Sequence, residues 1–302
     1  MTSVHYVLAM PLVGSYAHVP AAEPHGLWGI EPVPLMVLLG SALLYAWGIR
    51  RLSLRGRSWP WKRTVPFCGG LVLIGIATQT PLASFDTRLF SAHVVQHLLL
   101  SMAAPALLCL GAPVTLALQA ADRPVQRTIL RLLHMPISRM ITFPLVSWVL
   151  FVGSLFVLYY SGLYELSLRN ELFHELVHMH FIMVGFLFFA PVVSIDPHPW
   201  GMPHGARLLY VGLTLPAHAF LALALLSATT PLALDWYLAV TSFDQGQILR
   251  DQKTGAALMW VAGDLIAIST VAIVVTQWAK QEDRVSIRED RYVDESSHPT
   301  SV

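Results

Sequence analysis

The sequence predicts an all-α polytopic membrane protein, a bundle of seven transmembrane helices. Of its 302 residues, 55% are hydrophobic and only 12% are charged, whereas about 25% are charged in an ordinary soluble domain. Seven windows of 18 or more residues carry no charged side chain, apart from Asp264 in the last. About 20 apolar residues make a helix long enough to cross the hydrocarbon. Each window can therefore form one span.

The predicted spans are apolar windows bounded by charged residues. In chain order they are residues 32–49, 64–85, 89–121, 140–164, 176–195, 208–234 and 254–279. Proline falls inside the third window at Pro105 and inside the sixth at Pro216. Proline removes a helix N–H and crowds the preceding turn, so we expect both helices to kink.

The positions of the cationic residues predict the orientation. Fifteen of the nineteen Lys and Arg fall in the first, third and fifth connections or after the last window, and such an excess is typical of the cytoplasmic side. We therefore expect the N-terminus outside and the C-terminus in the cytoplasm. The net charge of +1 gives no indication of a nucleic-acid partner.

This reading divides the chain into three parts. Residues 1–31 form an external N-terminal tail and residues 32–279 form the transmembrane domain. Residues 280–302 form a cytoplasmic tail, for which the polar composition predicts disorder. None of the connections is long enough to hold a soluble active site, so we expect function to reside in the bundle.

Two pairs of histidines stand out, His93 with His97 in the third span and His174 with His178 in the fifth. Residues four apart lie on one helix face, so each pair presents two imidazoles in one direction. At 1.5 Å per residue, all four lie about 5–13 Å from the nearest outer charge. If the two helices touch, the imidazoles converge below the external surface as a metal site for copper, zinc or iron.

Four further side chains are secondary candidates. Met259 lies at a similar depth on the seventh span and would add a thioether, which favours Cu(I). His218 and Asp264 lie near mid-bilayer and can pair if the last two spans are adjacent, as a structural pair or as a proton relay. His180 lies about 200° around the helix from His178.

A His-x3-His-x4-Met repeat occurs twice and ends in Met102 and Met183. At 100° per residue, each methionine lies about 140° from the second histidine of its repeat. We therefore expect both methionines to be packing residues rather than ligands.

Two other functions fit part of this pattern. His174-Glu175-Leu176-Val177-His178 matches the HExxH motif of zinc metalloproteases, in which the glutamate is the general base. An intramembrane zinc metalloprotease needs a third protein ligand and an open water position, whereas the second histidine pair tends to fill the coordination sphere. A haem-binding membrane protein would use one histidine from each helix and leave the other pair without a role.

With these residues in view, the chain resembles the CtaG family of multispan proteins required for assembly of haem-copper cytochrome c oxidases. The resemblance covers most of residues 33–278 and departs from the family pattern at Ala106 and at Ala262-Gly263-Asp264. It is carried by His93-x3-His97-Leu98-Leu99, Ala104-Pro105, Leu110-Gly111-Ala112-Pro113, His174-x3-His178, Gly185-Phe186-Leu187-Phe188, Pro191, Arg207-Leu208-Leu209-Tyr210, Asp251-Gln252, Gly255 and Met259-Trp260.

The resemblance implies a non-enzymatic metallochaperone that helps load copper into the oxidase, with Cu(I) favoured over Cu(II). By this resemblance, the copper ligands are His93, His97, His174 and His178. The resemblance assigns no role to Asp264. The implied partners are one or more cytochrome c oxidase subunits, an external soluble copper carrier and the lipid bilayer, with oligomerisation left open. A site on the external, periplasmic side agrees with an oxidase whose metal centres face outward.

Overall fold

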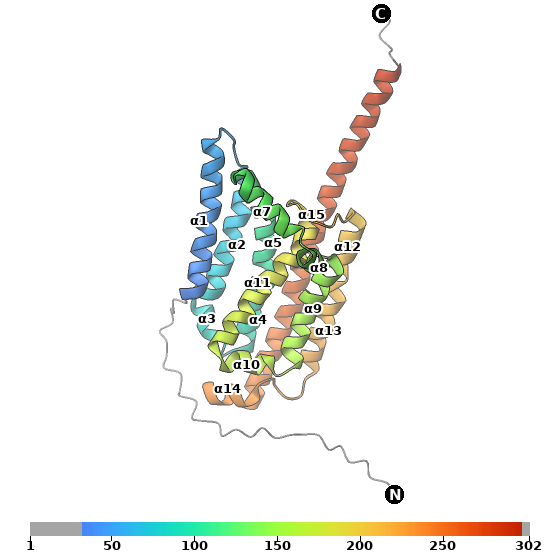
Figure 1. Cartoon of the computed structure of the whole chain (residues 1–302). Helices are drawn as coiled ribbons and strands as arrows, with labels where there is room; N and C mark the ends of the chain where they lie inside the picture. Colours follow the sequence, from blue (N-terminus) through green and yellow to red (C-terminus); the bar gives the residue numbers. More distant parts are fainter. Residues whose placement is uncertain (1–31, 298–302) are drawn as a thin grey trace, which may run out of the picture.

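The computed structural model describes residues 32–297, and this part of the chain consists of helices and short connections without a strand (Figure 1). The expected all-α class is confirmed. Residues 1–31, predicted to form the external tail, lie outside the described residues. At one end of the bundle lie the short helices α3 (Pro81–Phe85), α10 (Leu163–Arg169) and α14 (Leu234–Val240), and we call it the α14 end. At the other lie α7 (Arg123–Leu133) and α8 (Pro136–Ile141), and we call it the α7 end.

Five helical segments are long and apolar enough to cross a membrane. A sixth arises if α9 (Pro144–Tyr160) and α10, which meet at an angle of 75°, count as one bent span. The chain is thus a multi-pass membrane protein. The five segments are α1 (Pro32–Leu54); Phe90–Leu110, comprising α4 (Phe90–Leu98), η1 (Leu99–Ala103) and α5 (Ala104–Leu110); α11 (Glu171–Val193); His204–Ser227, comprising α12 (His204–Gly212) and α13 (Thr214–Ser227); and Gln245–Arg288 within α15 (Gln245–Ser297).

The second predicted window corresponds to α2 (Trp61–Gln79) and α3. Helix α2 is not one of the five segments, although it packs beside α1 and α5 in the bundle (Figure 1). Its first turn carries Lys62 and Arg63, and glycines interrupt its apolar run. The structure therefore supports five or six spans by length and composition, rather than the seven predicted.

The third span ends earlier than predicted. The chain leaves the helix after Leu110, and Ala112 adopts a left-handed conformation with φ of 50°. Pro113 then begins a separate helix, α6 (Pro113–Ala120), which packs against α1. Uncharged composition alone could not mark this corner, because the turn is made of residues as apolar as the helix before it.

The helix is irregular at both prolines for which a kink was predicted. Before Pro105 the helix passes through the π turn η1, in which the Ala104 N–H bonds to the Leu99 carbonyl, five residues earlier. Proline offers no N–H to the Ser101 carbonyl and crowds it, which accounts for the irregular turn at this point. In the sixth segment the helix breaks at Leu213, and Pro216 lies in the first turn of α13.

The last helix continues beyond the bundle (Figure 1). Helix α15 runs to Ser297. Most of the tail from residue 280, for which the sequence predicted disorder, therefore continues this helix. No glycine or proline occurs between Lys280 and Ser297, and Gln, Glu and Arg are strong helix formers. Low apolar content had predicted disorder, but it does not by itself stop a helix that is already nucleated.

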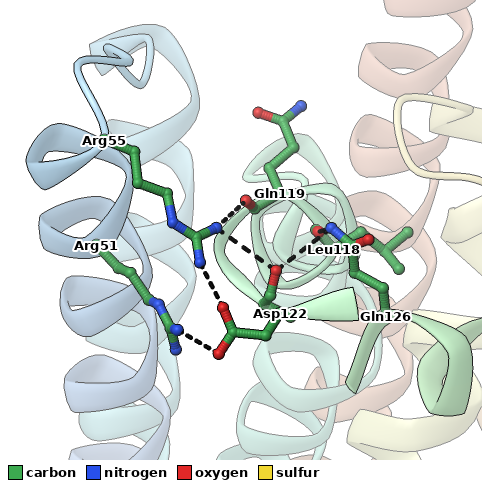
Figure 2. Close-up of polar contacts among 7 residues, drawn as sticks. Arg51, Arg55, Leu118, Gln119, Asp122 and Gln126 are labelled. Carbon is green, nitrogen blue, oxygen red and sulfur yellow. Dashed lines mark hydrogen bonds and ion pairs between the residues drawn. The ribbon is translucent and has the colours of Figure 1, made fainter. Parts of the chain in front are cut away.

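A polar cluster joins α1 to the corner between α6 and α7 at the α7 end (Figure 2). Arg51 and Arg55 each approach one carboxylate oxygen of Asp122, at 2.5 and 2.7 Å. Arg55 also donates to the Gln119 carbonyl at 3.3 Å, and Gln126 donates to the Leu118 carbonyl at 2.8 Å. These contacts hold the end of α1, most of whose surface is exposed, against the rest of the bundle.

We expect the mobility of this end of α1 to depend on pH through Asp122. The hydrogen bond from Arg51 holds the pKa of the Asp122 carboxyl below its ordinary value of 3.8. Because the pKa is lower in the folded state, the contact stabilises the fold above the unfolded value and is lost as pH falls through the folded one. A spin label at exposed position 54 should become more mobile in that acid range. Asp122→Asn should make it mobile at neutral pH, whereas the control Asp283→Asn should not.

Candidate metal centre

The four predicted histidines converge in one cluster. Helices α4 and α11 both begin at the α14 end and run in the same direction (Figure 1). In each helix the two histidines are the fourth and eighth residues. The ring centroids of His93 and His174 are 5.7 Å apart, and those of His97 and His178 are also 5.7 Å apart. Within each helix the centroids are 4.0 and 4.2 Å apart. The predicted parallel packing of these two helices at matched depth is confirmed.

A glycine permits the close approach of α11 to η1 and α5, which continue α4. A Cβ atom at Gly185 of α11 would lie 2.1 Å from the Ser101 carbonyl oxygen and 2.8 Å from Pro105 Cγ. Only a residue without a side chain fits against this backbone. The same Pro105 that produces the π turn thus also forms the surface against which α11 packs.

The starts of both helices are fixed by side chains. The side-chain oxygen Oδ1 of Asn170 accepts a hydrogen bond from the Phe173 N–H at 2.9 Å and caps α11. At the start of α4, the Asp251 carboxylate of α15 accepts hydrogen bonds from the Ser91 hydroxyl at 2.5 Å and the Ser91 N–H at 3.3 Å. These contacts set the height at which each histidine pair lies.

Asp86, just before α4, is the acidic residue of the cluster. Its Oδ2 lies 2.7 Å from His174 Nε2, and both residues are buried. His174 Nδ1 lies 3.3 Å from the Ser167 carbonyl, which can only accept, so Nδ1 carries a proton. Nε2 and the carboxylate then need a second proton between them, and a bound cation can take that proton's place.

Gln96 orients the second imidazole of α11. Its Oε1 lies 3.0 Å from His178 Nε2, and its amide nitrogen donates to the Ala77 carbonyl at 3.0 Å. With the amide oriented in this way, His178 Nε2 is the protonated nitrogen. His178 Nδ1 then carries a free lone pair, and it has no hydrogen-bond partner. Fixing the tautomer through the other ring nitrogen is typical of metal-binding histidines.

The cluster fits a metal ion by its unpartnered donor atoms. Both ring nitrogens of His93 and both of His97 are buried without a hydrogen-bond partner, although a buried polar atom without one costs about 1–3 kcal/mol. One ligand atom from each of Asp86, His174 and His178 lies within 4.8 Å of the others. A metal ion bound here would satisfy atoms that the protein leaves unsatisfied.

Aromatic side chains cover the cluster toward the α14 end. The Tyr164 ring of α10 meets the His93 ring edge-on at a centroid distance of 5.0 Å. The hydroxyls of Tyr164 and Tyr237 of α14 lie 2.5 Å apart. Burial raises the pKa of the Tyr237 hydroxyl, so it stays protonated at neutral pH. The four histidines are at most 8% exposed, so a ligand can enter only if neighbouring side chains move.

Glu175 of the HExxH segment and His180, two residues after that segment, face elsewhere. His180 Nε2 lies 2.7 Å from the Ser154 hydroxyl of α9, away from the cluster. Glu175 lines an apolar cavity of about 140 Å³ between α1, α2 and α11, which His178 also borders. One carboxylate oxygen of Glu175 is buried without a hydrogen-bond partner.

The structure places Met259 and His218 beside His97 but does not pair His218 with Asp264. His218 and Met259 line a small cavity with His97, and Met102 lines it too. The expected pairing of His218 with Asp264 is absent from the described structure, where His218 Nδ1 and Asp264 Oδ1 each lack a hydrogen-bond partner. Helices α13 and α15 are adjacent as the pairing required. However, His218 Nδ1 faces the Gly263 backbone, where a Cβ would lie 3.1 Å away.

Comparison with known proteins identifies the family of this chain. The sequence model of the family described as Cytochrome c oxidase caa3 assembly factor (Caa3_CtaG) matches residues 43–281. The chain belongs to the CtaG family. This confirms the resemblance found from the histidine pairs and their flanking motifs.

Proteins with similar sequences occur in mycobacteria. The chain is 33% identical over 257 residues to "Uncharacterized protein ML1998" of Mycobacterium leprae (strain TN) and 33% identical over 260 residues to "Uncharacterized protein Mb0105" of Mycobacterium bovis (strain ATCC BAA-935 / AF2122/97). These alignments cover 83% and 84% of this chain but only 39% of either relative. The chain therefore spans about two fifths of the length of these relatives. No solved structure matches it.

Proposed function

We propose that this protein binds copper in its four-histidine cluster and helps load it into a haem-copper cytochrome c oxidase. The observation that carries the proposal is the buried group of imidazoles whose ring nitrogens have no hydrogen-bond partners. Membership in a family of oxidase assembly factors supports the choice of recipient. Binding and release of a metal require no bond-making catalysis, so the role proposed is that of a metallochaperone rather than an enzyme.

We also propose a topology of seven spans, with α2 crossing the membrane beside α1. The N-terminus then lies outside, the α14 end faces the external side of the bacterial cytoplasmic membrane, and α15 leads into the cytoplasm. The distribution of cationic residues supports this choice, because the arginines of the α1 end and of α7 lie together at the α7 end (Figure 1).

We favour Cu(I) over Cu(II) as the cargo. Imidazoles suit both, but the nearest unused ligands below the cluster are the thioethers of Met102 and Met259, which select the softer ion. An external soluble carrier would supply the ion and an oxidase subunit would receive it. Release to a partner requires ligand exchange at the α14 end, through the cover formed by Tyr164 and Tyr237.

An intramembrane zinc metalloprotease remains the second candidate because of Asp86. The sequence alone lacked a third ligand for the HExxH pair, and Asp86 now stands with His174 and His178 in a group of three ligand atoms. This is the ligand number of a catalytic zinc site. His93 and His97 argue against it, since they crowd the position that a water would need.

The geometry argues against haem. A porphyrin held between α4 and α11 would have to pass between imidazoles whose centroids are 5.7 Å apart and whose rings are nearly perpendicular. The cavities that His97 and His178 line measure about 10 and about 140 Å³. Small-molecule pockets are usually at least about 300 Å³.

The copper proposal predicts that single histidine changes abolish metal loading. Protein purified from copper-supplied membranes should carry copper, and His97→Ala or His178→Ala should lower the copper content at least tenfold. His180→Ala is the matched control, since His180 lies on the same helix but binds Ser154. Normal copper content in both cluster variants, measured by elemental analysis of folded protein, would contradict the proposal.

A further inference from the structure

A small cavity lined by buried side chains lies directly below the four-histidine cluster. It has a volume of about 10 Å³ and is lined by His97 of α4, Met102 of η1, His218 of α13 and Met259 of α15. These four side chains are between 2% and 3% exposed. Three separate segments of the chain thus place two imidazoles and two thioethers around one point.

Met102 reaches this cavity because of the π turn. In a regular α-helix a residue five positions after His97 would lie on another face, and this is why the sequence predicted only packing. In the π turn η1 the backbone hydrogen bonds join residues five positions apart instead of four. Met102, five residues after His97, is therefore turned toward the helix face that carries His97. Met183 has the same spacing from His178, but α11 is α-helical throughout and Met183 is 57% exposed. The two halves of the repeat therefore have different roles.

The histidines that line the cavity lack partners. Within the described residues, both nitrogens of His97 and Nδ1 of His218 are buried without a hydrogen-bond partner. The His218 ring is held between Phe151, at a centroid distance of 6.3 Å, and the Gly263 backbone. The missing side chain at Gly263 leaves room for this ring. Unpaired buried imidazoles beside two buried thioethers indicate that a second ligand binds in this cavity.

The size and the donor set restrict that ligand. A volume of about 10 Å³ is at the lower limit for a single water molecule, and it is far too small for an organic ligand. Thioether and imidazole donors select Cu(I) among biological cations, whereas hard cations need oxygen ligands. A water molecule would need two to four polar partners. Ser101 and Tyr159 also line the cavity, but the Ser101 hydroxyl already donates to the His97 carbonyl at 2.6 Å, and Val94, Leu98 and Leu155 are apolar.

We propose that this cavity is a second coordination position, a sulfur-containing Cu(I) site formed by His97, Met102, His218 and Met259. The proposal rests on the proposed copper function and extends it. His97 belongs to both positions, so a Cu(I) ion can pass from the upper cluster to the lower site by exchanging ligands on one shared imidazole. The ion keeps its charge throughout and never enters the lipid.

The test compares the bound copper in three purified proteins by Cu(I) titration against a competing chelator without oxygen and by X-ray absorption. The wild type should bind a further equivalent of Cu(I) with sulfur in its coordination shell. The double variant Met102→Leu with Met259→Leu, which keeps side-chain volume, should lose that equivalent and all sulfur scattering. Met183→Leu is the matched control and should behave like the wild type.

Each other result overturns the proposal. Copper bound by nitrogen alone in the wild type would contradict the second site and indicate water in the lower cavity. The proposed copper binding by the four histidines would still stand. Sulfur scattering that persists in the double variant would place the thioether ligands elsewhere. If the double variant does not fold, the single variants decide, since each should reduce the sulfur contribution by about half. A wild type that binds no Cu(I) at all would instead contradict the proposed function itself.

Discussion

Gly185→Ala is expected to separate α11 from α4 and to lower copper loading at least tenfold. The new Cβ would lie 2.1 Å from the Ser101 carbonyl oxygen, an atom of the backbone that cannot rotate away. Overpacking of this kind commonly costs about 1–3 kcal/mol. The helix can relieve the contact only by moving outward, which carries His174 and His178 away from their partners. Thermal unfolding in detergent and copper content of the same sample would measure both effects.

The matched control is Gly153→Ala in α9. A Cβ at that glycine meets nothing within 4 Å, and alanine has a higher helix propensity than glycine. We expect unchanged or slightly higher stability and normal copper content. If Gly185→Ala also loaded copper normally, the close approach of α11 to the π turn would not be what assembles the site.

The histidine cluster was predictable because its two signals are local. Spacing by four residues fixes the shared face within each helix, and the distance to the nearest charge fixes the depth. What brings the pairs together is the packing of α11 against η1 and α5, the continuation of α4. The sequence predicted the cluster only on the condition that these two spans touch. The structure meets that condition through Gly185 and Pro105, and both residues were among the motifs that carried the family resemblance.

Asp86 and Gln96 were missed for different reasons. Asp86 lies in the connection before α4 and contacts His174, which is remote in sequence, so no local pattern marks the pair. Gln96 lies between the two histidines of α4, and its uncharged amide gave no metal signal. It acts by fixing the tautomer of His178. Such positioning residues can be recognised only when the partner is known.

Met102 and the third span show where regular helical periodicity fails. The angle of 100° per residue holds for an α-helix, and Pro105 disrupts it four residues after Ser101. A prediction that allowed for a π turn before a buried proline would have brought Met102 to the face of His97. Pro113, after a left-handed residue, likewise ended an apolar window that composition left continuous.

Glu175→Gln separates the copper chaperone from the zinc protease, and we expect it to leave oxidase copper loading largely unchanged. The substitution keeps the size and hydrogen-bonding capacity of the side chain and removes its ability to accept a proton. A zinc hydrolase needs that carboxylate as its base, and its loss should lower the rate about 10²-fold or more. The four-histidine site does not include the Glu175 carboxylate. Glu175 borders the cavity between α1, α2 and α11 instead.

The measurement is oxidase copper content in cells that carry Glu175→Gln beside cells that carry His97→Ala or His178→Ala. Either mechanism requires the histidines, so their loss confirms the metal site without identifying its chemistry. The glutamine variant has a different meaning because Asp86, and not Glu175, is the carboxylate in contact with a cluster histidine. If Glu175→Gln were as damaging as the histidine changes while the purified protein still held its metal, the carboxylate would be acting in catalysis. The chaperone proposal would then be wrong, and a cleaved membrane substrate should be sought.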